Sequence, residues 1–258
     1  AAGNCVVIKP AEQTPVSISV FVNLIADLVP EGVLNIVHGF GPEAGKPLAS
    51  SSRINKIAFT GETTTGRLIM QYASNNIIPV TLELGGKSPF IVFEDADLDA
   101  AVEGVVDAIW LNQGEVCCAG SRLLLQESIA EKMVGKLQQR MQQLRVGNPL
   151  DKAIDIGSLV SKTQLERVKR LTNEGAKAGA SLWQPQISLP ETGCFFAPTL
   201  AINIVIGIKI KNAGKFIKPI LRGNSALSID PEKQNPIAPH NAMIKPIVAA
   251  LPIAFFIG

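Results

Sequence analysis

The chain has 258 residues, of which 47% are hydrophobic and 18% are charged, a composition typical of a globular α/β protein with a sizeable core. A net charge of +2 argues against nucleic acid or a membrane surface as the main partner. The chain has only two histidines, and its four cysteines lack a CxxC spacing, which excludes a histidine-rich or zinc-type metal site. The sequence shows no signal peptide and no apolar run long enough to span a bilayer, and its cysteines are expected to stay reduced. These features predict a cytoplasmic protein.

The first 86 residues alternate between short apolar runs and stretches with helical spacing. Strands are predicted over residues 5–8, 33–37, 56–59 and 79–82, and helices over residues 16–29, 42–50 and 64–74. Strand and helix follow each other with short links, which is typical of a parallel sheet covered by helices on both faces.

A second unit is predicted to begin near Lys87. Strands are expected over residues 89–93 and 121–126, and helices over residues 97–110, 127–144 and 162–178. A polar link over residues 112–116 leads to Cys117. We therefore expect a domain boundary between residues 1–86 and residues 87–200.

The composition changes at residue 201. From there on, the chain has only two acidic residues but seven lysines and arginines, and it contains six of the seventeen prolines. Because proline interrupts helices and inner strands, we expect residues 201–258 to form an irregular tail outside the ordered core, cut by proteases between residues 202 and 219. The apolar run over residues 202–208 leaves an added edge strand as the alternative.

Cys117 lies in a loop predicted between a helix and a strand, within residues 114–122. A catalytic thiol needs partial exposure and nearby backbone N–H groups that hold the thiolate, and such a loop supplies both. The alternative is that Cys117 and Cys118 are ordinary buried residues without reactivity.

Glu83 ends an apolar strand and is followed by Gly85 and Gly86, which allow a backbone or a ligand to come close. Parallel-sheet proteins place their active sites at such strand ends, and a partly desolvated carboxylate there suits a general base. The alternative is a structural ion pair between Glu83 and Lys87.

Three further places favour binding of a dinucleotide. The turn from Gly61 to Gly66 joins a strand to a helix, whose first N–H groups can hold a pyrophosphate, and Gly41 closes a similar turn. Lys9 and Glu12 follow the first strand, where they can bind ribose hydroxyls. Each place is a common feature by itself, and Lys9 and Glu12 also fit a solvated helix start.

Taken together, these motifs resemble the aldehyde dehydrogenase superfamily over about residues 3–200, and some bacterial acetaldehyde-type members look similar at the turn after Gly61. Residues 80–89 are similar to the family's glutamate motif and residues 114–122 to its cysteine motif. The resemblance implies that Cys117 is the nucleophile and Glu83 the base. It also implies an NAD site formed by Lys9, Glu12, Gly41, Gly61, Gly66 and Leu84.

The resemblance further implies a three-layer α/β fold, with the parallel sheet of a Rossmann-like NAD-binding domain in residues 1–86 and part of an α/β catalytic domain in residues 87–200. The implied reaction is the NAD-dependent oxidation of an aldehyde to a carboxylic acid through a cysteine thiohemiacetal and thioester, in a protein whose full-length relatives are homo-oligomers. Glu12 would repel a 2′-phosphate, which favours NAD over NADP.

The sequence departs from the family at two places. Glu62 stands where the family often has serine, and a carboxylate beside a pyrophosphate is unfavourable unless it points away. The family's oxyanion-hole asparagine and its Glu-Ile-Phe-Gly-Pro stretch are not found. Two alternatives therefore stay open, an inactive remnant that only binds nucleotide or oligomerises, and a cofactor-independent thiol hydrolase of activated esters.

Overall fold

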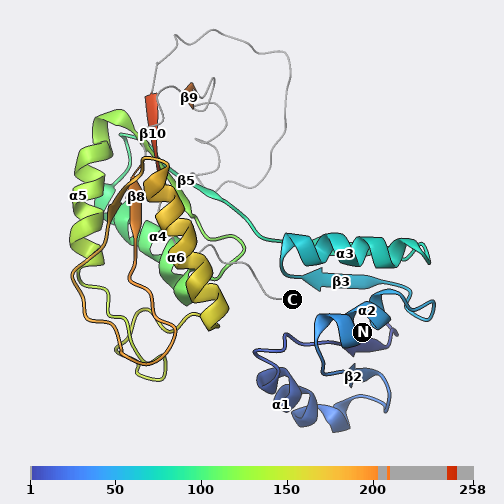
Figure 1. The fold of residues 1–258 in the computed structure, drawn as a ribbon. Coiled ribbons are helices and arrows are strands. Elements are labelled where there is room, and N and C mark those ends of the chain that lie inside the picture. Colours follow the sequence, from blue (N-terminus) through green and yellow to red (C-terminus); the bar gives the residue numbers. More distant parts are fainter. Residues whose placement is uncertain (1, 203–207, 210–242, 249–258) are drawn as a thin grey trace.

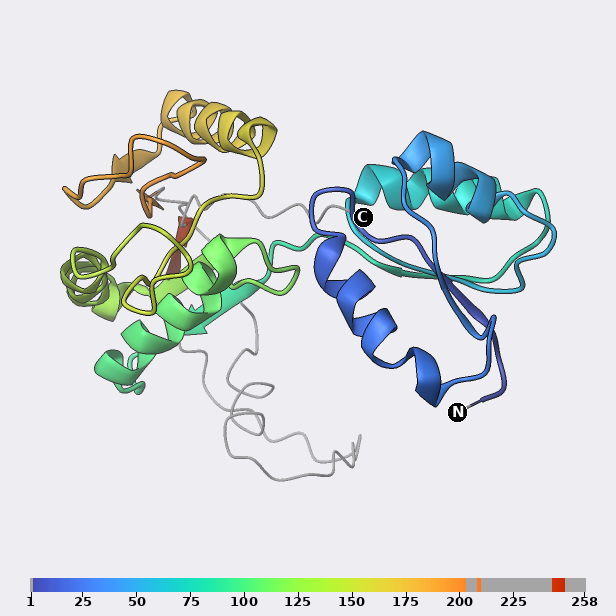
Figure 2. The same cartoon turned by 90° about the horizontal axis from the view of Figure 1, so that it is seen from below.

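The computed structural model describes residues 2–202, 208–209 and 243–248. These residues form two units, which Figures 1 and 2 show side by side and joined by the chain after β4 (Val80–Glu83). The first unit is residues 2–86, drawn in blue to cyan. The second unit is residues 87–202 together with β9 (Ile208–Lys209) and β10 (Met243–Val248).

The first unit alternates strands and helices, as the sequence predicts. Its elements are β1 (Val6–Ile8), α1 (Val16–Leu24), η1 (Ala26–Leu28), β2 (Leu34–Ile36), η2 (Gly41–Gly45), α2 (Lys46–Ala49), β3 (Ile57–Thr60), α3 (Thr63–Ser74) and β4 (Val80–Glu83). The predicted helix over residues 16–29 is divided between α1 and η1, because the backbone leaves the helical region at Ile25.

The strands of the first unit pair in parallel, as predicted, but they form two separate pairs and not one continuous sheet. β1 pairs with β2 and β3 pairs with β4. Alternation of strand and helix determines that consecutive strands run in parallel, whereas it carries no information on whether one pair hydrogen-bonds to the next. Burial is slight here, and α1 contains no buried residue.

The second unit is built around one mixed sheet. Its elements are β5 (Pro89–Val92), α4 (Leu98–Trp110), η3 (Leu111–Gly114), β6 (Arg122–Gln126), η4 (Glu127–Ile129), α5 (Ala130–Met141), α6 (Lys162–Lys177), β7 (Ser181–Trp183), β8 (Leu200–Ile202), β9 (Ile208–Lys209) and β10 (Met243–Val248). The sheet order is β5-β6-β10-β8-β7, and β9 pairs with β10. β5 and β6 are parallel, whereas β10 and β7 run antiparallel to their neighbours.

The main core of the described chain lies where α4 and α5 pack on β6. Leu123 and Leu125 of β6 and Met133 and Leu137 of α5 are fully buried, and α4 contributes one face that includes Ile109. Burial of each such side chain contributes roughly 1.5–3 kcal/mol, so this cluster dominates the stability of the second unit.

Polar contacts fix how the two helices begin and face each other. Asp97 caps α4, because its carboxylate accepts hydrogen bonds from the N–H groups of Asp99 and Ala100. Arg140 of α5 donates to Glu103 of α4 at 2.8 Å. None of the described helices is both long and apolar enough to cross a bilayer.

The expectation that prolines break every regular element after residue 200 is wrong for β10. This strand contains Pro246, which lies opposite Leu124 of β6. On its other side β10 pairs with β8 at Ile247 and Val248 and with β9 at Met243 and Ile244, so the residues between them face no described partner there. A proline without an N–H group is tolerated at such a gap. Most of the predicted cleavage region, residues 202–219, lies outside the described residues.

Candidate active site

Glu83 is the last residue of β4, next to the turn that follows β3. The parallel register places Thr60 opposite Glu83, and the Gly61 N–H donates to the Glu83 carbonyl oxygen at 2.9 Å. We call residues 61–66 the strand-to-helix turn. The start of this turn therefore lies beside the C-terminal end of β4. The Glu83 side chain is exposed and not partly desolvated as expected, because alternate residues of this short strand face solvent.

Cys117 lies in the thiol loop, defined here as residues 111–121. The loop leaves α4 through three consecutive residues with positive φ, which are Asn112 at 50°, Gln113 at 58° and Gly114 at 76°. Residues other than glycine avoid positive φ, because this conformation costs roughly 1–3 kcal/mol for each such residue. Strain of this kind is concentrated at functional sites. The turn leaves Cys117 half-buried, as a reactive thiol requires, and Cys118 exposed.

The loop that follows Glu83 runs directly against the thiol loop. A Cβ atom added to Gly86 would lie 2.3 Å from the carbonyl oxygen of Cys117, so only glycine permits this approach. The sequence predicts that Gly85 and Gly86 allow a close approach, and the structure identifies Cys117 as the partner. Residues near Glu83 and near the thiol, 34 positions apart, are thereby brought together.

Arg122 holds the same junction and is not among the residues that the sequence singles out. Its Nε donates to the Lys87 carbonyl oxygen at 2.6 Å, and its N–H group donates to the Ser88 carbonyl oxygen at 3.2 Å. Burial, together with the charge of Arg167, lowers the pKa of Lys87. The junction therefore contains the cationic side chain of Arg122, and Arg167 lies near enough to Lys87 for its charge to lower the Lys87 pKa.

Glu115 is a second carboxylate at the thiol loop that sequence reasoning missed. It is half-buried, and burial raises the pKa of Glu115 above its ordinary value. Its side chain accepts a hydrogen bond from the Val160 N–H group at 3.5 Å, and Gln113 donates to the Ser158 carbonyl oxygen at 3.2 Å. A carboxylate two residues before a cysteine is the feature that could have drawn attention to it.

Lys9 and Glu12, which the sequence predicts to bind ribose hydroxyls, form an ion pair with each other in the structure. The Lys9 ammonium lies 3.2 Å from the Glu12 carboxylate, and both side chains are half-buried. Gly41 begins η2 and has open space beside it. A cavity of about 350 Å³ lies next to this turn, lined by residues 37–39, which follow β2, and by residues of η2 and α2.

The strand-to-helix turn presents a helix start without a side-chain cap. Gly61 and Gly66 are buried, and Gly66 lies so close to Leu84 that an added Cβ atom would be 2.6 Å from its Cδ2 atom. Glu62, which precedes α3, makes no capping hydrogen bond and instead pairs with Arg167 at 3.5 Å. The departure from serine at position 62 therefore does not direct its carboxylate into its own helix start.

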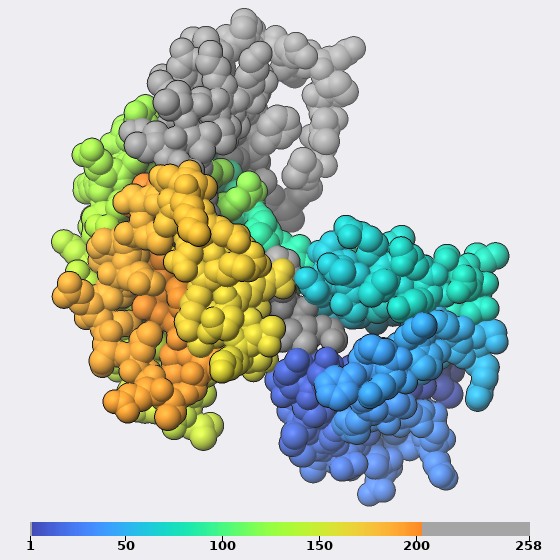
Figure 3. All heavy atoms as spheres, viewed as in Figure 1, coloured from blue at the N-terminus to red at the C-terminus, as the bar shows by residue number. Residues whose placement is uncertain are grey.

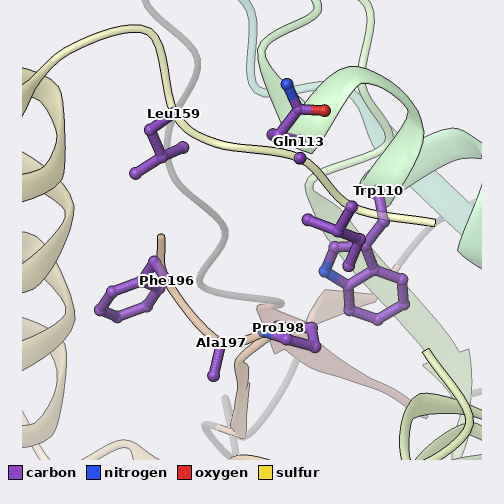
Figure 4. A pocket seen from close by; sticks show the side chains of 8 residues that line it. Trp110, Gln113, Leu159, Phe196, Ala197 and Pro198 are labelled. Atoms are coloured by element: carbon purple, nitrogen blue, oxygen red, sulfur yellow. The ribbon is translucent and has the colours of Figure 1, made fainter. Parts of the chain in front are cut away.

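A small cavity inside the second unit is too narrow for a substrate. It is lined by Trp110, Gln113 and Leu159 on one side and by Phe196 and Pro198 on the other (Figure 4). Its volume of about 10 Å³ is the space of roughly one water molecule. The described residues also contain no group of three histidine, cysteine, aspartate or glutamate side chains that could hold a metal ion.

Comparison with known proteins gives one consistent family. The model for the Aldehyde dehydrogenase family matches residues 1–212. The chain is 58% identical over 186 residues to Acetaldehyde dehydrogenase 2 of Cupriavidus necator, and 60% identical over 188 residues to an aldehyde dehydrogenase of Paracoccus denitrificans. Each alignment covers 70% of this chain and 37% of the relative, so the chain spans a little over a third of these proteins.

Solved structures give the same result. PnpE from Pseudomonas sp. WBC-3 superposes with a TM-score of 0.74 at 39% identity, over 77% of this chain and 42% of that chain. The aldehyde dehydrogenase of Bacillus cereus, solved as an NAD+ complex, superposes with a TM-score of 0.72 at 42% identity, over 76% of this chain and 40% of that chain. These matches support the α/β fold described above.

Proposed function

Because this chain belongs to the aldehyde dehydrogenase family, we propose that it carries the cofactor- and thiol-bearing part of an enzyme that oxidises an aldehyde to a carboxylic acid with NAD. In this proposal residues 1–86 are part of the NAD-binding domain and residues 87–200 part of the catalytic domain. The observation that carries the proposal is the contact of Gly86 with the Cys117 carbonyl, which brings the Glu83 strand end to the thiol loop.

Several residues of the first unit fit a dinucleotide. The start of α3 has no side-chain cap, so its N–H groups beside Gly61 can hold a pyrophosphate, and Gly66 and Leu84 set how closely α3 approaches β4. The Lys9–Glu12 pair would bind ribose hydroxyls, near the turn at Gly41. The Bacillus cereus relative was solved with NAD+, which supports this choice of cofactor. The bound nicotinamide supplies the hydride acceptor.

The protein's own groups carry the remaining chemistry. The Cys117 thiolate adds to the aldehyde carbon and forms a thiohemiacetal, which becomes a thioester when the carbon loses a hydride. Glu83 takes a proton from a water molecule, whose oxygen attacks the thioester carbon. The acid leaves and the Cys117 thiolate is restored. Exposure of Glu83 gives it access to water, and the half-buried state of Cys117 suits a reactive thiol.

The relative from Cupriavidus necator is named for acetaldehyde, so we propose a small aliphatic aldehyde as the first substrate to test. We also place the protein in the cytoplasm and expect the full-length protein to self-associate. The first of these is supported by the four cysteines, which are all free.

The test is iodoacetamide labelling at neutral pH with peptide mapping, together with NADH formation at 340 nm on addition of acetaldehyde. We expect Cys117 to react before Cys118, although Cys118 is more exposed. C117A should abolish both signals, while the matched control C118A should keep them. Preferential labelling of Cys118 or Cys194 would refute the role of Cys117.

Glu83→Gln separates the two half-reactions. Because Glu83 is assigned to the hydrolytic step, this variant should give one burst of NADH followed by slow turnover. Ester hydrolysis by the wild type without any NADH formation would favour the cofactor-independent hydrolase. Binding of NAD without either reaction would favour a module that only binds nucleotide.

A further inference from the structure

One ion pair joins the two units at the strand-to-helix turn. The Arg167 guanidinium on α6 lies 3.5 Å from the Glu62 carboxylate, which directly precedes α3. Both views of the ribbon show the first half of α6 facing the start of α3 (Figures 1 and 2). In the space-filling view, α6 in yellow is the helix of the second unit that comes next to α3 in cyan (Figure 3).

The local backbone conformation keeps the Glu62 side chain from capping its own helix, α3. Glu62 has an extended conformation, with φ −69° and ψ 143°, and its side chain makes no hydrogen bond to its own helix. The preceding residue, Gly61, is held by its hydrogen bond to the Glu83 carbonyl. Because Glu62 follows Gly61 directly, the position of the Glu62 carboxylate is coupled to a turn that is hydrogen-bonded to the end of β4.

On the other side, the chain that leads into α6 contacts the thiol loop. Gln113 donates to the Ser158 carbonyl oxygen, and Val160 donates to Glu115. Residues 158–167 thus contact the thiol loop at one end and the strand-to-helix turn at the other. The lowered pKa of Lys87, caused by burial and by the charge of Arg167, agrees with Arg167 lying close to the link between the units.

We propose that Glu62 and Arg167 are positioning residues whose ion pair sets the spacing between the strand-to-helix turn and the thiol loop. The proposal rests on the proposed function for its meaning in catalysis, because that function places the dinucleotide at the turn and the reacting carbon at Cys117. In this proposal the pair acts through the turn and the thiol loop and not by touching the reacting atoms. Glutamate at position 62 has this role because serine is too short to reach α6.

The contact can be tested without any activity. Arg167→Lys places an amine opposite the Glu62 carboxylate, and a carbodiimide, which inserts no spacer, then joins the two side chains in an amide that peptide mapping detects. The same treatment of the double variant E62Q/R167K is the matched control and should lose this product. Absence of a cross-link between positions 62 and 167 in R167K would overturn the proposal.

The positioning role is tested by a double-mutant cycle. The dissociation constant for NAD is measured by calorimetry for the wild type, E62Q, R167Q and E62Q/R167Q. Both side chains are about a third exposed, at 34% for Glu62 and 33% for Arg167, so the expected coupling is modest, about two- to five-fold in Kd. Independent effects that simply multiply would overturn the role.

A third readout separates this proposal from the proposed function. Amide hydrogen exchange at residues 61–66 should be faster in R167Q, although the substitution lies in the other unit, and unchanged in the control K169Q on the exposed face of α6. If the wild type binds no NAD, the proposed function fails, and the cross-link and the exchange still decide the ion pair. Unchanged exchange in R167Q would overturn it.

Discussion

Replacement of Gly86 by alanine tests the junction on which the candidate site depends. The added Cβ atom would lie 2.3 Å from the Cys117 carbonyl oxygen, whereas real Cβ contacts are essentially never under 3.0 Å. One of the two backbones must therefore move by at least about 0.7 Å, which is the difference between these distances. No flexible side chain can absorb the change, because the obstructing atom belongs to the main chain.

The displacement should affect both stability and chemistry. Forcing one extra carbon into a filled site costs about 1–3 kcal/mol in the free energy of unfolding. A shift approaching 1 Å in a reacting group can cost about 100-fold in the rate of the catalysed reaction. The same shift changes the surroundings of the Cys117 thiol, so we also expect a changed rate of Cys117 labelling by iodoacetamide in G86A. Cys118 in the same molecule serves as the internal reference, because it is exposed and should be unaffected.

The assays are urea unfolding and the rate of Cys117 labelling by mass spectrometry. Gly175→Ala in α6 is the matched control, since an added Cβ atom meets nothing within 4 Å there. That variant should gain up to about 1 kcal/mol, because alanine favours the helix over glycine. A G86A protein with wild-type stability and wild-type Cys117 reactivity would refute the close approach of the two loops.

Three further predictions address the core, the thiol loop and the cofactor. Leu123→Ala, at a fully buried position of β6, should lower the free energy of unfolding by about 2–5 kcal/mol in urea titrations, whereas Leu182→Ala, 36% exposed, should have a small effect. Because burial raises the pKa of Glu115, its contribution to stability is full below its ordinary value of 4.5 and is lost as the pH rises through the raised pKa. The urea midpoint of the wild type should therefore fall relative to E115Q above pH 4.5, and parallel pH profiles would contradict this. If Glu12 binds the adenosine ribose, calorimetry should give tighter binding of NAD than of NADP, and E12S should reduce that preference; tighter NADP binding by the wild type would count against Glu12.

Local features of the fold are predictable from the sequence because they depend on neighbours within a few residues. The apolar runs that become β1, β3 and β4 are read correctly to within about a residue, and the Asp97 cap marks the start of α4. β7 and β8 are not predicted. β1 is equally short, but it lies in an apolar run that ends at Lys9-Pro10, whereas three residues alone are too few for alternation to be recognised.

For the candidate site, the sequence by itself singles out Cys117, Glu83 and the glycines as candidates, since they stand in motifs whose order and spacing are visible in the chain itself. Tertiary structure alone decided that Gly86 meets Cys117, that Glu62 turns to Arg167, and that β10 enters the sheet beside β6. The physical reason is one of range. Helical periodicity and caps act over three to five residues, whereas these contacts join segments about 30 to 120 positions apart and form only when the packing of both units brings them together.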